Sequence, residues 1–168
     1  MAYDSLSTES ATQLKTMSMP MTHHSQLITP FVSILMPIRN EAGFIERSLK
    51  AVLSQDYPPE RMEVIVIDGM STDGTREIVK RIIEQIEGAR PSPQSQLTTH
   101  HSPLTTRRPS VTLLDNPSQI VPTALNIGLK HARGDVIIRV DGHCEIAPDY
   151  VRRCVEVLQE TGADCVGG

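Results

Sequence analysis

Hydrophobic residues recur along this chain in short continuous runs, separated by longer stretches with a helical period. The runs at residues 32–36 and 64–67 are almost entirely aliphatic, and the second contains only β-branched residues. Such continuous runs are typical of strands that are buried on both faces, as in parallel sheets. Similar runs predict three further strands, at residues 111–114, 136–140 and 163–166.

Between these runs, apolar residues return every three or four positions, which predicts an amphipathic helix after each of the first four strands. Local signals mark the helix ends. Asn40 and residues 71–73 are expected to cap the first two helices, and Pro122 to begin the third. We expect Gly134 to end the third helix, and Pro148 and Gly162 to bound the fourth.

Strands that alternate with helices predict an α/β fold, with a mostly parallel sheet and helices flanking it. Ligands of such sheets bind outside the carboxyl ends of the strands. Polar side chains follow three of the predicted strands at this point: Arg39 and Glu41, then Asp68, then Asp141 and His143. The pattern therefore predicts a polar ligand site along one edge of the sheet.

Two segments lack any apolar period. Residues 1–30 are rich in Ser, Thr, Met and Gln and are expected to be a disordered leader. Residues from about 88 to 110 contain four prolines and are expected to form a mobile, exposed insertion. The remaining part of the chain, from 31 to 168, is expected to be one domain.

Composition narrows the possible functions. The formal net charge is −4, so there is no basic surface of the kind that binds nucleic acid. Aromatic residues make up only 3% of the chain, so the core must be aliphatic. The three cysteines form no Cys-x-x-Cys pair, which suits a reducing compartment, and no apolar run approaches the roughly 20 residues that span a bilayer. We therefore expect a soluble, cytoplasmic protein without a secretory signal.

Asp141 and His143 are the candidate metal ligands. A carboxylate and an imidazole can share one divalent cation, and Gly142 between them would leave space for a ligand. The alternative is a strand that ends in a polar turn. The chain has neither Gly-x-Gly-x-x-Gly nor Gly-x-x-x-x-Gly-Lys-Ser/Thr, which disfavours a dinucleotide or P-loop site. Asp68 can accept hydrogen bonds from a base or a ribose, so these residues together describe a nucleotide-diphosphate site.

Residues 31–168 resemble the nucleotide-sugar half of family 2 inverting glycosyltransferases, which have the GT-A fold, a Rossmann-like fold of nucleotide-diphospho-sugar transferases. The resemblance is carried by residues 32–41, 64–75, 124–128 and 132–135. It is also carried by Asp141-Gly142-His143, which stands where the family has Asp-x-Asp. The Asp-Gly-His-Cys form is similar to enzymes of bacterial exopolysaccharide synthesis, such as the succinoglycan-type transferases.

The resemblance implies a role for each of these positions. Pro37, Arg39 and Glu41 would line the nucleotide pocket, and Asp68 would contact the uracil or another base. Asp141 would approach the ribose and the metal, and His143 would ligate the metal, Mn²⁺ or Mg²⁺. The implied reaction transfers a sugar from a UDP-sugar or similar donor to a glycan or lipid-linked acceptor, in polysaccharide biosynthesis.

Two positions depart from the family pattern. Gly69 and Met70 stand where the family has Asp and Gly, so base recognition can differ, and His143 replaces an aspartate. Structural roles also remain open: Asp68 could cap the turn that follows it, and Glu41 could serve the first turn of a helix.

No catalytic base is identified, because the family's base and acceptor half would follow residue 168. We therefore expect a truncated donor half, inactive alone, which would work at the inner membrane face if the full-length form carried C-terminal helices. The alternatives are a nucleotide-binding module or inactive pseudoenzyme, and a non-catalytic interaction domain.

Overall fold

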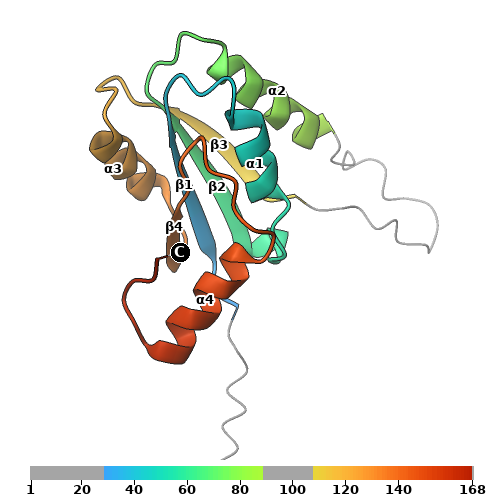
Figure 1. Ribbon diagram of the computed structural model, residues 1–168, viewed down its shortest axis with the longest axis vertical. Helices are drawn as coiled ribbons and strands as arrows, with labels where there is room; N and C mark the ends of the chain where they lie inside the picture. Colours follow the sequence, from blue (N-terminus) through green and yellow to red (C-terminus); the bar gives the residue numbers. More distant parts are fainter. Residues whose placement is uncertain (1–28, 89–107, 168) are drawn as a thin grey trace, which may run out of the picture.

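A four-stranded parallel sheet forms the centre of the structure, a computed structural model that describes residues 29–88 and 108–167 (Figure 1). The strand order is β3-β2-β1-β4. Every pairing is parallel, with Val32 of β1 opposite both Met62 of β2 and Val136 of β4. The strands are β1 (Val32–Ile38), β2 (Met62–Asp68), β3 (Ser110–Asp115) and β4 (Val136–Arg139).

Helices cover both faces of this sheet (Figure 1). Ile34 and Met36 of β1 belong to a large hydrophobic cluster that also contains buried residues of three helices, α1, α2 and α4. Leu35, on the opposite face of β1, packs in a smaller cluster with Ala124 of α3. The helices are α1 (Ile45–Leu53), α2 (Thr75–Gly88), α3 (Val121–His131) and α4 (Tyr150–Thr161), and a short 3₁₀ turn, η1 (Pro59–Arg61), precedes β2.

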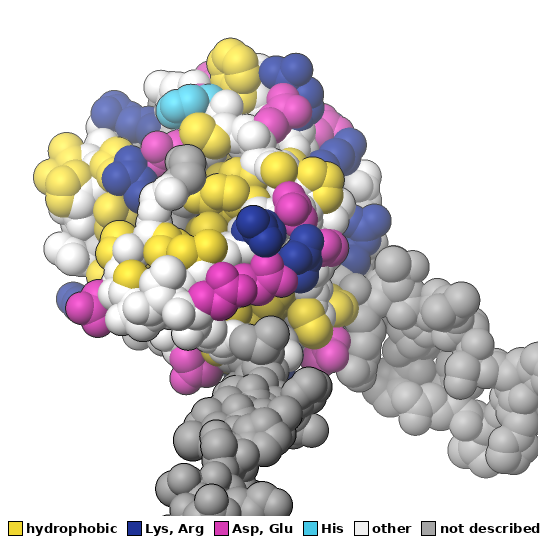
Figure 2. Space-filling view, turned by 60° about the horizontal axis from the view of Figure 1, so that its bottom comes forward, with side chains coloured by type: hydrophobic (Ala, Val, Ile, Leu, Met, Phe, Trp, Pro, Cys, Tyr) yellow, Lys and Arg dark blue, Asp and Glu magenta, His cyan; other side chains and the backbone are white. Residues whose placement is uncertain are grey.

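These elements confirm the predicted α/β alternation through the fourth helix. The two fully buried strands, β1 and β2, are the runs that read as continuously apolar. Gly162 ends α4 in the left-handed conformation, with φ of 65°, as expected for a C-terminal glycine. On the face shown in Figure 2, hydrophobic side chains reach the surface among neighbouring acidic and basic side chains.

The predicted fifth strand is wrong for the described residues. Residues 163–167 after α4 form no strand, and they line a second cavity of about 730 Å³ beside β4. The segment is short and exposed, and it makes no ladder hydrogen bonds with the outer edge of β4.

Gly134 has a different role from the predicted helix cap. Helix α3 ends at His131, and its C-cap is Ala132, two residues before Gly134. A Cβ atom at Gly134 would lie 2.5 Å from the Ser33 backbone nitrogen and 2.7 Å from Ser33 Oγ. This glycine is therefore required by the close approach of the α3–β4 connection to the start of β1.

Two other predicted boundaries are also wrong. Phe44, not Asn40, occupies the N-cap position of α1, and no side chain caps that helix end. Helix α4 begins at Tyr150, two residues after Pro148, whose carbonyl accepts a hydrogen bond from the Asp56 amide.

The leader and most of the insertion, residues 1–28 and 89–107, lie outside the described residues. Among the described helices, none has the length and apolarity to cross a membrane.

Candidate functional site

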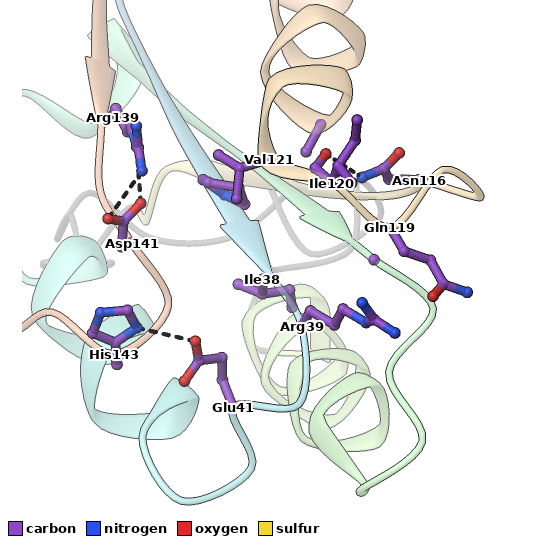
Figure 3. Close-up of a pocket in the computed structure, with 13 residues that line it drawn as sticks. Ile38, Arg39, Glu41, Asn116, Gln119, Ile120, Val121, Arg139, Asp141 and His143 are labelled. Carbon is purple, nitrogen blue, oxygen red and sulfur yellow. Dashed lines mark hydrogen bonds and ion pairs between the residues drawn. The ribbon is translucent and has the colours of Figure 1, made fainter.

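The predicted polar edge of the sheet contains a pocket of about 340 Å³ at the carboxyl ends of the strands (Figure 3). Five of the six predicted site residues line it: Pro37, Arg39, Glu41, Asp141 and His143. Asp68 does not. The other lining residues come mainly from the β3–α3 connection and the start of α3: Ile38, Gly69, Asn116, Gln119, Ile120, Val121, Ala124 and Arg139.

A tight turn after β4 brings Asp141 and His143 into this pocket. The Cys144 amide donates to the Asp141 carbonyl at 3.0 Å, so the two side chains converge through a turn and not along an extended strand. Gly142 is buried in this turn, and a Cβ there would lie 2.8 Å from Ile38 Cγ2 and 3.1 Å from Glu41 Cγ. The glycine therefore lets the loops after β1 and β4 touch, whereas the sequence suggested that it leaves space for a ligand.

Glu41 holds the His143 ring. Its Oε1 lies 3.0 Å from His143 Nδ1 (Figure 3). The hydrogen bond and the negative charge of Glu41 raise the pKa of His143 above its usual value of 6.5. When Nδ1 donates to the carboxylate, Nε2 carries the free lone pair, which is the arrangement found at histidines that ligate metals.

Asp141 is held by the arginine that ends the preceding strand, β4. Arg139 Nε donates to Asp141 Oδ1 at 2.9 Å, and Nη2 donates to Oδ2 at 3.1 Å (Figure 3). Two parallel hydrogen bonds of this kind fix the plane of the carboxylate as well as its position.

The donor set fits a divalent cation. One ligand atom from each of Asp141, His143 and Cys144 lies within 4.8 Å of the others. Carboxylate oxygen and imidazole nitrogen both bind first-row divalent metals. The partly buried side chain of Cys144 packs against the large hydrophobic cluster and does not line the pocket, which leaves Asp141 and His143 as the candidate ligands there.

The loop after β1 is fixed to the loop after β2. Asn40 has a positive φ of 55°, a conformation that asparagine tolerates, and its Oδ1 accepts from the Thr72 amide at 2.9 Å. The Glu41 amide donates to Thr75 Oγ1 at 2.7 Å, and the Ala42 amide donates to Asp73 Oδ2 at 3.0 Å. Arg39 and Glu41 therefore project from a braced loop.

Arg39 is exposed and has no ion-pair partner among the described residues. A Cβ on Gly69 would lie 3.2 Å from Arg39 Cβ and 3.3 Å from its Cδ. The glycine that departs from the family pattern thus gives space to the Arg39 side chain, which lies across the end of β2 at the pocket.

Asp68 is fully buried, and its carboxylate is already hydrogen bonded. It accepts from the Ser71 amide at 3.1 Å, from Ser71 Oγ at 2.5 Å and from Arg76 Nη1 at 3.1 Å. Arg76 also pairs with Asp115 at 2.6 Å. These contacts realise the alternative in which Asp68 caps the turn after β2, and its contact with a nucleobase stays a prediction.

Three polar residues of the pocket were not singled out from the sequence: Asn116, Gln119 and Arg139. Arg139 lies two positions before Asp141, so the spacing of the two residues was the available signal. Asn116 directly follows β3 and is almost fully buried, and its Oδ1 is without a hydrogen-bond partner among the described residues. A buried amide oxygen of this kind, at the lining of a pocket, favours a ligand site over a purely structural turn.

Comparison with known proteins agrees with this geometry. The family model described as Glycosyl transferase family 2 matches residues 33–168. The succinoglycan biosynthesis protein ExoA of Rhizobium meliloti is 36% identical over 135 residues, which are 79% of this chain and 34% of ExoA. The glycosyltransferase AglE of Haloferax volcanii is 33% identical over 139 residues, which are 83% of this chain and 39% of AglE. The chain thus spans between a third and two fifths of the length of these relatives.

Solved structures show the same fold. The mannosyltransferase PcManGT of Pyrobaculum calidifontis, in complex with GDP-Man and Mn²⁺, matches 83% of this chain and 36% of its own. Its TM-score is 0.63 and its sequence identity is 29%. TarS of S. aureus in complex with UDP matches 79% of this chain and 33% of its own, with a TM-score of 0.58 and 20% identity. The sheet order, the pocket and the matched residues together place this chain in glycosyl transferase family 2, with the GT-A fold.

Proposed function

We propose that this chain is the donor-binding part of a glycosyltransferase, and that its pocket takes a nucleotide-diphosphate sugar together with a divalent cation. The observation that carries the proposal is the convergence of Arg39 and Glu41, after β1, with Asp141 and His143, after β4, on one pocket. Arg39 supplies an exposed positive charge, Asp141 and His143 the metal-ligand pair, and Glu41 the carboxylate that orients the imidazole.

The relatives support the class of donor and of product. ExoA is a succinoglycan biosynthesis protein, PcManGT was solved with GDP-Man and Mn²⁺, and TarS was solved with UDP. By similarity, the donor of this chain is a GDP- or UDP-sugar, and the acceptor is a glycan or a lipid-linked saccharide. With three free cysteines, Cys144, Cys154 and Cys165, we assign this activity to the cytoplasm.

In the proposed site, Asp141 and His143 hold the cation, which stabilises the leaving diphosphate when it is bound. Glu41 orients His143, and Arg39 extends over Gly69, where its guanidinium can reach the base or the phosphates. The displacement is inverting by resemblance to the family, and we assign no general base among these residues.

Calorimetric titration of GDP and UDP, with and without Mn²⁺, tests this proposal. We expect wild type to bind one of them more tightly with Mn²⁺, and Asp141→Ala to remove the metal-dependent part of binding. His143→Asp should retain this part, because hard oxygen ligands suit these cations. Asp164→Ala is the matched control, since it removes an exposed carboxylate outside the pocket.

Two results would contradict the proposal. Equal binding in the presence of a chelator would refute the metal site, and absence of binding by either nucleotide would refute the donor site. Metal-dependent binding without sugar transfer, even when an acceptor and the rest of a family enzyme are supplied, would favour the nucleotide-binding module or pseudoenzyme.

A further inference from the structure

The predicted metal ligand Asp141 already has a cation beside it. Arg139 donates to both of its carboxylate oxygens, at 2.9 and 3.1 Å. In the described residues, Asp141 is the only ion-pair partner that Arg139 has. Both residues line the pocket, and the Arg139 side chain is 51% exposed. The pair is therefore part of the site but is not packed into the protein.

A guanidinium and a metal ion compete for the same charge on Asp141. A divalent cation needs a lone pair on one of these two oxygens and draws on the same negative charge. If Arg139 kept its position, a third positive charge would lie within a few ångströms of the metal, and the two cations would repel each other. Half exposure gives the arginine side chain space to leave, because neighbouring side chains do not enclose it.

We infer that Arg139 neutralises Asp141 while no metal is bound, that the divalent cation displaces the Arg139 side chain, and that the released guanidinium then binds the diphosphate of the donor. This inference rests on the proposed donor site. The released side chain stays in the pocket, since its backbone is at the end of β4, next to the turn that carries Asp141 and His143. Guanidinium groups bind phosphate oxygens through the same two-pronged geometry that Arg139 now uses on the carboxylate.

Such an exchange makes the binding of the metal and the nucleotide interdependent. Without nucleotide, Arg139 weakens the binding of metal, because the metal must break the ion pair. With nucleotide, the freed arginine gains a new anionic partner. The diphosphate therefore stabilises the state in which the metal is bound to Asp141 and Arg139 to the phosphates. By linkage, metal raises the affinity for nucleotide by the same factor as nucleotide raises the affinity for metal.

The test separates these two parts with one set of variants of the 168-residue chain. Arg139→Gln removes the charge, and Arg139→Lys keeps the charge but loses the two-pronged contact. Arg81→Gln is the matched control, because Arg81 is 55% exposed and pairs with Glu46 at 3.2 Å outside the pocket. Mn²⁺ binding without nucleotide is measured by electron paramagnetic resonance, and GDP and UDP binding at saturating Mn²⁺ by calorimetry.

We expect Arg139→Gln to bind Mn²⁺ alone about two- to fivefold more tightly than wild type, the size of effect of an exposed ion pair. The same variant should bind the nucleotide about tenfold more weakly at saturating Mn²⁺, because a charged hydrogen bond is lost. For both ligands, the affinity of Arg139→Lys should fall between those of wild type and Arg139→Gln. The affinities of Arg81→Gln should match those of wild type within about twofold.

Mn²⁺ affinity that is unchanged or weaker in Arg139→Gln would overturn the inference, since it would mean that the arginine supports the carboxylate as a metal ligand. Nucleotide affinity at saturating Mn²⁺ equal to that of Arg81→Gln would overturn the second part. These results differ from failure of the proposed function, in which wild type itself binds neither GDP nor UDP while the comparison with Mn²⁺ alone still decides the first part.

Discussion

The two nitrogens of His143 have different environments, and this difference sets a pH dependence. Nδ1 faces Glu41, whose hydrogen bond and charge raise the pKa of His143 above 6.5. A histidine that ligates a metal must be neutral, so protons and metal compete for Nε2. We therefore expect the Mn²⁺-dependent gain in nucleotide affinity to be complete at high pH and to fade as pH falls through this raised pKa. Titrations between about pH 5 and 8 measure the midpoint.

Two variants act as controls for this midpoint. Glu41→Gln removes the charge that raises the pKa, so the midpoint should move down, towards the ordinary histidine value. His143→Asp should move it further down, into the range in which carboxylates titrate. A midpoint that is the same in wild type and in Glu41→Gln would contradict the assigned role of Glu41.

At the residue scale, the sequence predicted which side chains meet but not what each one touches. Pro37, Arg39, Glu41, Asp141 and His143 were predictable because they follow strands whose carboxyl ends lie at one edge of a sheet. The contact of Glu41 with His143 was not, because residues 102 positions apart meet only through the packing of two loops.

Among the elements, the connection between α3 and β4 lies against the start of β1 with no space for an added side chain. Gly134 lies where any Cβ would overlap the backbone nitrogen of Ser33, at 2.5 Å, and the Val136 carbonyl, at 2.8 Å. We expect Gly134→Ala to lower the free energy of unfolding by about 2–3 kcal/mol, the upper part of the range for overpacking. Urea denaturation measures this loss.

Gly43→Ala is the matched control for this variant. No atom lies within 4 Å of a Cβ at Gly43, and its φ is outside the left-handed range. Its stability should be equal to that of wild type or slightly higher, because alanine restricts the unfolded chain. Equal losses in the two variants would show that the close approach to Ser33 is not the cause.

The Glu63 carboxylate, near the start of β2, joins the α3–β4 connection to the start of β1 through hydrogen bonds. Glu63 is only 5% exposed and accepts hydrogen bonds from Ser33 Oγ at 2.7 Å and from the Arg133 amide and Nε, both at 2.9 Å. Burial by itself raises the pKa of Glu63, but the hydrogen bonds from Arg133 and Ser33 outweigh it, and the pKa is lowered below 4.5.

The sign of this shift predicts an acid-labile contribution to stability. It is fully present above pH 4.5, and it is lost as pH falls through the lower pKa of the folded state. Glu63→Gln should lower the free energy of unfolding by about 1–3 kcal/mol at pH 7, and by less at acidic pH. Glu60→Gln is the control, because it changes an exposed side chain on the neighbouring 3₁₀ turn. Its free energy of unfolding should stay within about 0.5 kcal/mol of wild type at both pH values. A loss for Glu63→Gln that does not depend on pH would rule out this origin.

At this scale the sequence predicted the elements well, since buried parallel strands have a simple pattern. It misplaced the features that tertiary contacts decide. From the sequence, Gly134 was predicted to end a helix and Gly142 to leave space for a ligand. In the structure, each glycine allows a close approach between segments that are distant in the sequence. The strand expected at residues 163–166 is wrong because, in the described part of the chain, this segment does not pair with the open edge of β4.

For the whole molecule, ligand binding should appear as thermal stability. A ligand that binds only the folded state stabilises it by about 2.7 kcal/mol at 100 times its dissociation constant. For a chain of this size we expect GDP or UDP with Mn²⁺ to raise Tm by about 5–10 °C in differential scanning fluorimetry. In Asp141→Ala, nucleotide alone should raise Tm as it does in wild type, and Mn²⁺ should raise it no further. A further rise with Mn²⁺ equal to that of wild type would place the metal elsewhere.

The central position of β1 also affects how the chain folds. It pairs with β4, whose residues come about a hundred positions later, and the Glu41–His143 contact spans 102 positions. Contacts of such high sequence separation require the closure of long loops, and they slow folding. The pocket can assemble only once the first and last strands of the described sheet are in register, so partly folded chains lack it. Nucleotide and metal should therefore slow unfolding while leaving the refolding rate unchanged.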